Sequence, residues 1–262
     1  MNSPAKVAEN YIGIGCGKMQ LSIPKMLVLG FMAGMYIAFG ALGSQVAAVS
    51  IAAPSVGKLV GAIVFSVGLM MVLCAGSELF TGNCLMIIPV LEKKGSLRLM
   101  LRNWLFVYIG NFIGGLFIAF AADYSGVYSL FDSRLAASVV SIAAGKASLS
   151  FTDALIKGIL CNILVCVAVW ISFAATEQAG KILGLMPPII VFVLCGFEHS
   201  VANMYFLPAG MLASHTYGIG AAGLTMNSFL IGNLLPVTLG NIIGGSFVVG
   251  CGYWFAFLRK SR

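Results

Sequence analysis

Two glutamates and a histidine stand inside long apolar stretches, where an ionisable side chain must have a partner or a task. "AGSELFTGN" (75–83) contains Glu78, and "CGFEHSVANM" (195–204) contains Glu198 and His199, one of only two histidines in the chain. An imidazole exchanges protons near neutral pH. His199 is therefore a candidate to give a hydrogen bond or a proton to a small acidic or anionic solute. A carboxylate accepts N–H donors, so we expect both glutamates to brace interrupted helices by accepting from freed backbone N–H groups.

The composition places these side chains in a membrane protein. The chain has 262 residues, of which 60% are hydrophobic and 9% charged, and its mean hydropathy is +1.02. Ordinary soluble domains carry about 25% charged residues. An ionisable side chain at the centre of a membrane span costs about 2.5–3.5 kcal/mol or more, which favours a functional role for His199 over a role in core packing.

Six apolar stretches are long enough to span a bilayer. We expect a channel domain at 26–258, preceded by a cytoplasmic segment at 1–25 and followed by a cytoplasmic tail at 259–262. The initial segment lacks the pattern of a signal peptide, and 5–16 is expected to form a short interfacial helix. The expected spans are 26–50, 58–91, 100–122, 152–175, 186–213 and 226–258.

The net charge of +7 follows the membrane topology. With both termini inside, the cytoplasmic segments contain most of the basic residues, as the positive-inside rule requires. This orientation accounts for the charge without a nucleic-acid partner. We expect a multi-pass protein of the prokaryotic inner membrane, with both termini cytoplasmic. The expected inner residues are Lys6, Lys18, Lys25, Lys93, Lys94, Arg98, Arg102, Lys181, Arg259, Lys260 and Arg262, and the outer ones are Lys58, Arg134, Lys146 and Lys157.

An internal repeat relates the two halves of the chain, about 26–122 and 152–258. The third and sixth spans match each other, because "NWLFVYIGNFIGG" (103–115) aligns with "NLLPVTLGNIIGG" (233–245). An odd number of spans in each half forces an inverted repeat, with its pseudo-twofold axis in the membrane plane. The second half has ten extra residues, expected in the outer loop near 213–228. In the second and fifth spans, Gly76, Glu78 and Asn83 recur as Gly196, Glu198 and Asn203, each 120 residues later.

Both repeated stretches are poor continuous helices. Gly76, Gly82 and Gly196 weaken the helical hydrogen-bond ladder, and nearby Ser, Thr and Asn side chains can satisfy broken backbone. Irregular backbone at membrane depth is tolerated only where it is buried in protein or lines a cavity. We therefore predict broken second and fifth helices whose half-helix N-termini face each other and favour an anion.

The chain offers little for metal or nucleophilic chemistry. Its seven cysteines include no C-x-x-C pair, and only one histidine lies near any of them, so neither a metal site nor a cofactor is expected. An intramembrane serine protease would use a Gly-x-Ser-Gly loop, and "AGSELF" lacks the second glycine. The protease remains a distant alternative, and we expect no enzymatic activity.

Four stretches resemble the formate/nitrite transporter family: "GFEHSVANM", "GSELFTGN", "KGILCNILVCVAVW" and "PVTLGNIIGG". The resemblance extends from "KLVGAIVFSVGL" to "GYWFAFLR", nearly the whole chain. It implies an all-α, aquaporin-like fold of six transmembrane helices, assembled as a homopentamer with one pore in each protomer. It also implies that formate, nitrite or hydrosulfide is the substrate, and the general character of the sequence leans toward the hydrosulfide branch.

The same resemblance implies roles for particular residues. His199 corresponds to the central histidine, Thr81 to the mid-pore threonine and Asn162 to the fourth-helix asparagine. Lys146 corresponds to the basic residue that draws anions into the outer vestibule, although by itself it reads equally well as a solvated loop lysine. The support of the broken helices is assigned to Glu78, Glu198, Asn83 and Asn203, and the constrictions to Leu69, Leu79, Phe80, Val165, Phe192 and Phe65.

These features together predict a channel for small monovalent anions of weak acids, with proton exchange at His199. A protonated, neutral acid crosses an apolar constriction more easily than its anion does. Inverted repeats and broken helices also occur in carriers, so an alternating-access anion/proton symporter of the same fold is the alternative.

Overall fold

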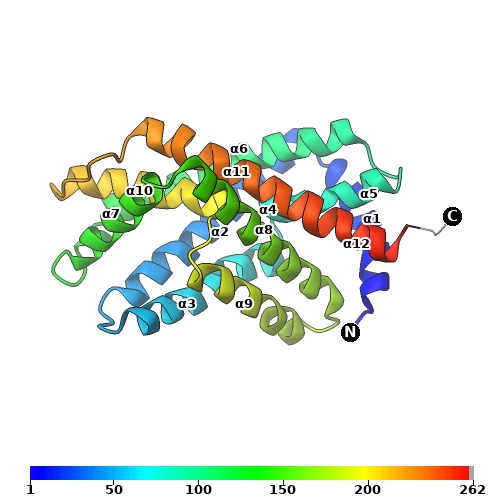
Figure 1. The fold of residues 1–262 in the computed structure, drawn as a ribbon, viewed down its shortest axis with the longest axis horizontal. Coiled ribbons are helices and arrows are strands. Elements are labelled where there is room, and N and C mark those ends of the chain that lie inside the picture. The colour runs from blue at the N-terminus through cyan, green and yellow to red at the C-terminus, as the bar shows by residue number, and fades with distance from the viewer. Residues whose placement is uncertain (260–262) are drawn as a thin grey trace.

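The computed structural model describes residues 1–259, which form helices joined by short connections (Figure 1). Lys260 and Arg262, expected in the cytoplasmic tail, lie outside the described residues. Five helices within the described part are long and apolar enough to cross a membrane. They are α2 (Ile23–Ala48), α3 (Pro54–Ala75), α6 (Leu97–Tyr124), α8 (Phe151–Ala174) and a helix at Ser228–Phe257 that comprises η3 (Ser228–Leu234), α11 (Leu235–Ile242), η4 (Ile243–Gly250) and α12 (Cys251–Phe257).

The second and fifth expected spans are each interrupted, as the sequence predicted. After α3, the chain turns at Gly76, whose φ is +81°, and resumes as α4 (Phe80–Asn83), η1 (Cys84–Met86) and α5 (Ile87–Leu91). After α9 (Gln178–Leu194), it turns at Gly196, whose φ is +68°, and resumes as α10 (Ser200–Thr216). Glycine adopts positive φ without a Cβ clash, which is why both breaks begin at this residue type.

One helix was not expected from the sequence. α7 (Arg134–Ala147) follows the short turn η2 (Val127–Ser129) and precedes α8. Lys146 therefore lies in the last turn of a helix and not in a loop. The segment 134–147 is too short to span a bilayer, and its amphipathic pattern is interrupted by small residues. Hydropathy alone therefore does not distinguish this helix from a connecting loop.

The two halves repeat one helix-pair geometry. α2 packs against α6, and α8 packs against α11. A Cβ added to Gly30 would stand 2.8 Å from the backbone oxygen of Val107, and one added to Gly158 would stand 2.8 Å from that of Val237. Small residues allow helices in membranes to approach this closely, so both helix pairs require glycine at the crossing.

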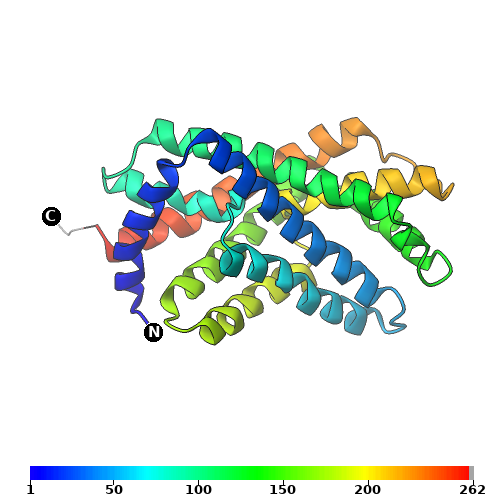
Figure 2. The same cartoon turned by 180° about the vertical axis from the view of Figure 1, so that it is seen from behind.

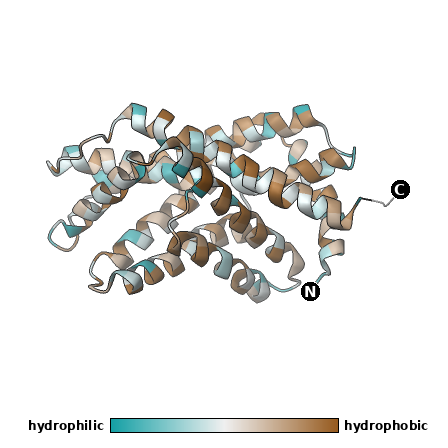
Figure 3. Ribbon diagram, viewed as in Figure 1, coloured by the Kyte–Doolittle hydropathy of each residue, from teal (hydrophilic) through white to brown (hydrophobic). Residues whose placement is uncertain are grey.

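Both ends of the described chain lie at the same end of the molecule, and the α2–α3 connection and the start of α7 lie at the other (Figures 1 and 2). α1 (Pro4–Met19) packs against α5 and α12. The backbone N–H of Asn2 donates to the carbonyl oxygen of Ala174 at 2.7 Å, which ties the first residues to the end of α8. Hydrophobic residues dominate the long helices, and hydrophilic ones gather toward the connections at the two ends (Figure 3).

Candidate functional site

The two helix breaks meet at His199 and Thr81. The Oγ1 atom of Thr81 lies 2.9 Å from Nε2 of His199, and both residues are buried. His199 is the N-cap of α10, and its Nδ1 accepts from the backbone N–H of Ala202 at 3.1 Å. Because Nδ1 accepts, a neutral His199 carries its proton on Nε2 and presents it toward Thr81.

Asn162, on α8, holds the Thr81 turn from the opposite side. Its Nδ2 donates to the carbonyl oxygen of Thr81 at 3.2 Å and to that of Asn241 at 2.6 Å. The structure thus brings His199, Thr81 and Asn162, which are far apart in the sequence, into one hydrogen-bonded cluster.

Two asparagines on the third and sixth helices secure the breaks. In the first half, the backbone N–H of Phe80 donates to Oδ1 of Asn111 at 2.9 Å, while Nδ2 of Asn111 donates to the carbonyl oxygens of Gly30 and Glu78 at 2.8 and 2.9 Å. Each asparagine amide therefore replaces backbone bonds that the interrupted helix has lost.

Asn241 repeats this arrangement in the second half. The backbone N–H of Ser200 donates to Oδ1 of Asn241 at 2.9 Å, and Nδ2 of Asn241 donates to the carbonyl oxygens of Gly158 and Glu198 at 2.8 and 3.0 Å. The expectation that Glu78 and Glu198 accept from freed backbone N–H groups is wrong in this respect, because the asparagines take that task. The repeated Gly-Asn pair in the third and sixth spans was the available signal.

The glutamate of the first half belongs to a buried polar network. Glu78 forms a salt bridge with Lys18 at 2.7 Å, and Nδ2 of Asn83 donates to Oε2 of Glu78 at 2.7 Å. Asn83 also donates to Oδ1 of Asn103 at 2.8 Å and accepts from Nζ of Lys18 at 3.0 Å. Every charged group is thereby paired, as buried charges must be.

The second half contains the matching network. Glu198 forms a salt bridge with Lys146 at 2.8 Å, and Nδ2 of Asn203 donates to Glu198 and Asn233, at 2.7 Å each. One contact differs, since Oδ1 of Asn203 is buried without a partner in residues 1–259. The Lys146 side chain is 16% exposed, so it is not an ordinary solvated loop lysine.

Lys18 is a site residue that sequence reasoning missed, since it was counted only as a basic residue of the cytoplasmic side. A signal was nevertheless present. Lys18 and Lys146 each precede by five residues the helix that opens their half, at Ile23 and Phe151. The carbonyl oxygens of both lysines accept from an asparagine, Asn103 at 3.1 Å and Asn233 at 3.0 Å.

Three cavities lie in series along the line of the two breaks. The wide vestibule, about 420 Å³, has Lys146, Phe65, Phe192 and His199 in its wall. The middle cavity, about 10 Å³, shares Phe65, Phe192 and His199 with the vestibule and adds Leu69, Leu79 and Val165. The narrow cavity, about 30 Å³, shares Leu69 and Leu79 and extends to Lys18 and Tyr11 of α1.

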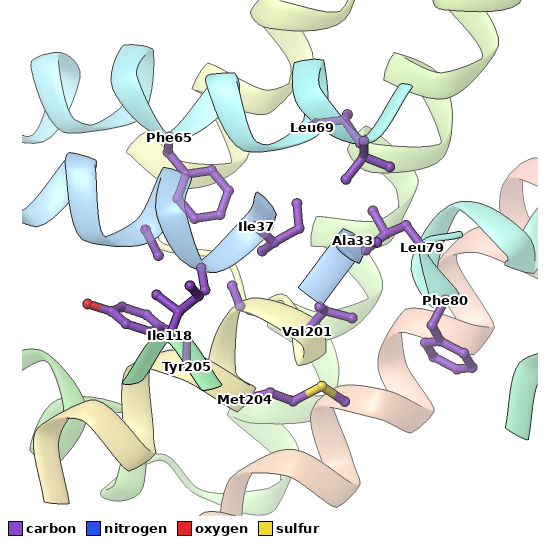
Figure 4. Close-up of a cluster of buried hydrophobic side chains, with 14 of the residues drawn as sticks. Ala33, Ile37, Phe65, Leu69, Leu79, Phe80, Ile118, Val201, Met204 and Tyr205 are labelled. Atoms are coloured by element: carbon purple, nitrogen blue, oxygen red, sulfur yellow. The ribbon is translucent and has the colours of Figure 1, made fainter. Parts of the chain in front are cut away.

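Apolar side chains separate these cavities. The rings of Phe65 and Phe192 meet edge to face, with centroids 5.5 Å apart, between the wide vestibule and the middle cavity. Figure 4 shows Phe65, Leu69 and Leu79 directed into the space between α2 and α3. Leu79 is the repeat equivalent of His199, 120 residues earlier, so the pseudo-symmetry pairs an apolar residue with the histidine.

Phe80 departs from the expected set of constriction residues. Its ring packs edge to face on Trp104 and Tyr108, with centroids 5.9 and 4.9 Å apart, and it lines none of the three cavities among the described residues. Consecutive residues at a helix start point in different directions, so Leu79 faces the cavities and Phe80 faces α6.

The family model for formate/nitrite transporters matches residues 5–255. The chain belongs to the formate/nitrite transporter family. A probable formate transporter of Methanothermobacter thermautotrophicus is 40% identical over 276 residues, covering 98% of each chain. The formate channel FocA of Escherichia coli K12 is 34% identical over 270 residues, covering 98% of this chain and 94% of FocA.

Solved structures agree with this membership in the formate/nitrite transporter family. A pentameric formate channel with formate bound superimposes with a TM-score of 0.80 at 32% identity, covering 90% of this chain and 98% of that one. An FNT family ion channel gives a TM-score of 0.86 at 30% identity, covering 96% and 98%. The aquaporin-like helical fold expected from the sequence is confirmed, and the chain is a membrane transport protein rather than an enzyme.

Proposed function

We propose that the chain is a channel for small monovalent anions of weak acids, with formate as the first candidate substrate. The observation that carries the proposal is the series of three cavities, in which His199 lines the wide vestibule and the middle cavity and is hydrogen-bonded to the buried Thr81 behind it. The names of the relatives favour formate. Nitrite and hydrosulfide are similar to formate in size and charge. The preference for hydrosulfide inferred from the sequence stays a prediction.

His199 and Thr81 are proposed to meet the anion after it has lost most of its hydration. In the neutral ring, the Nε2 proton can be given to an anion as a hydrogen bond in place of Thr81. Full proton transfer requires an imidazolium, and Nδ1 is occupied by the backbone N–H of Ala202. Proton exchange at His199 therefore requires the ring to leave this cap while an anion is present, and the neutral acid then crosses the apolar constriction.

The remaining expectations are part of the same proposal. Phe65, Leu69, Leu79, Val165 and Phe192 form the constrictions. Glu78, Glu198, Asn83 and Asn203 support the broken helices through their lysine-centred networks. We expect five protomers with one pore each, because the structural relative is a pentameric formate channel. Charge asymmetry favours termini on the cytoplasmic side of the inner membrane.

The test is flux into proteoliposomes of purified protein, with formate, nitrite and hydrosulfide compared at equal concentration. The proposal expects rapid uptake of at least one anion and no uptake of an uncharged solute of similar size. Absence of flux for all three anions would overturn it, and the ranking decides among the three substrates.

An alternating-access carrier is the second candidate, favoured by the unequal cavities of about 420 and 30 Å³ on the two sides of the constrictions. A carrier that is closed on one side would have this asymmetry. A carrier is expected to accelerate uptake when the same anion is loaded inside the vesicle, whereas a channel is not.

A further inference from the structure

The wide vestibule contains a second cation, Lys58, to which the sequence assigned only an outer-rim location. Lys58 lies in the first turns of α3, and its side chain is exposed. Two lysines, Lys58 and Lys146, belong to the wall of this cavity, and within residues 1–259 no carboxylate does.

The two lysines differ in charge compensation. Lys146 is paired with Glu198 at 2.8 Å, so together they carry no net charge. Lys58 forms no salt bridge in the described part of the chain. The field of a close ion pair is that of a dipole and falls off faster with distance than the field of a single charge, which follows Coulomb's law. At equal distances of several ångströms, the lone charge of Lys58 therefore attracts an anion more strongly than the Lys146–Glu198 pair does.

Lys58 reaches from the first half of the chain to the helix break of the second half. Its Nζ lies 3.5 Å from the position that a Cβ would occupy on Gly196, the residue at which α9 turns toward Glu198 and His199. A cation beside the C-terminus of α9 is also favoured by the helix dipole. The ammonium group of Lys58 therefore lies beside the turn that leads to His199.

A second observation indicates that the same wall contains an unpaired hydrogen-bond donor. Gln45 belongs to the vestibule wall and is 3% exposed. Tyr205 donates to its Oε1 at 3.0 Å, and Tyr128 lies 3.3 Å from the hydroxyl of Tyr205. These two hydrogen bonds fix the orientation of the Gln45 amide, whose Nε2 is buried and has no partner in the described residues. A buried donor without a partner is rare and calls for a ligand or water.

We propose that Lys58 and Gln45 form a recruitment subsite for small monovalent anions in the wide vestibule, ahead of the Phe65–Phe192 constriction. The inference rests on the proposed channel function and adds the residues that concentrate the substrate. Lys58 draws the hydrated anion, a small rotation of the Gln45 amide turns its unpaired Nε2 N–H toward that anion, and His199 receives the anion next. In this scheme, Lys146 acts mainly through its network with Glu198.

The test measures initial formate uptake, below saturation, in intact cells and in inverted membrane vesicles that contain Lys58→Gln, Lys58→Arg or the unaltered channel. Sucrose maintains osmolarity at about 10 mM ionic strength, where the Debye length is about 30 Å. Uptake by Lys58→Gln should fall about two- to ten-fold from either side of the membrane, the effect of one unit charge in a partly solvated site. Lys58→Arg should retain the rate, and Arg134→Gln, an exposed charge at the start of α7, is the matched control.

Salt dependence separates recruitment from a purely structural role. The deficit of Lys58→Gln should shrink below about 1.5-fold at 1 M salt, where the Debye length is about 3 Å. The reduction should be the same in both orientations, because a passive channel below saturation conducts equally from either side at equal anion concentration. Unchanged uptake at low ionic strength, or the same loss at every salt concentration, would overturn the inference. Absence of formate uptake by the unaltered channel would instead overturn the proposed function.

Discussion

Replacing Asn241 by alanine should destabilise the second half of the protein and displace His199. The substitution removes one acceptor, used by the backbone N–H of Ser200, and two donations, to Gly158 and Glu198. Hydrogen bonds within membrane proteins contribute on average about 0.6 kcal/mol, with a maximum near 1.7 kcal/mol. Leaving a buried N–H unpaired costs about 1–3 kcal/mol. We therefore expect a loss of about 2–4 kcal/mol in the free energy of unfolding.

The assay is unfolding in lipid bicelles by increasing SDS, followed by circular dichroism, with formate flux measured after the same purified protein is reconstituted into liposomes. Flux should fall by at least half, because Ser200 is the residue after His199 and begins α10. Asn227→Ala is the control, since Asn227 is exposed and its side chain makes no capping bond. An exposed substitution of this kind should stay within about 0.5 kcal/mol.

The equivalent substitution in the first half sharpens this test. Asn111→Ala removes the corresponding bonds to Phe80, Gly30 and Glu78, so its stability loss should be similar. If Asn241→Ala unfolds like Asn227→Ala and keeps full flux, the view that these asparagines hold the breaks is refuted.

Three further predictions follow from the same geometry. His199→Asn should fold and conduct, and should lose the pH dependence of flux and any proton movement with the anion between about pH 5 and 8; a mutant with the unaltered pH profile would demote His199 to a selectivity role. Lys146→Glu should cut anion flux strongly because it opposes Glu198 with a second carboxylate, and the exchange Lys146→Glu with Glu198→Lys should restore part of the flux; equal flux in the single and double variants would contradict the pairing. Gly158→Leu should prevent stable assembly, as judged by size-exclusion chromatography, because the Cβ would meet the backbone of Val237; Gly145→Leu, where a Cβ meets open space, is the control.

The sequence by itself determined the membrane class, the inverted repeat and the breaks in the second and fifth helices. These depend on local or periodic properties, namely long apolar runs, glycine at the turns and repeated spacing of Glu, Asn and Gly. His199 could be singled out because an ionisable side chain is costly at membrane depth. The family resemblance supplied Thr81, Asn162, Lys146 and the constriction residues. All of these except Phe80 line the cavities or take part in buried side-chain hydrogen bonds.

Only the tertiary structure decided which polar groups satisfy one another. Asn111 and Asn241 bond to breaks on other helices, and Lys18 reaches Glu78 across 60 residues of sequence. No local pattern specifies such partners, because they depend on how two helices pack. The same holds for the opposite directions of Leu79 and Phe80, for the helix α7 that contains Lys146, and for the position of Lys58 beside Gly196. Burial forces each polar group to find a partner, and the packing of the helices determines which partner is within reach.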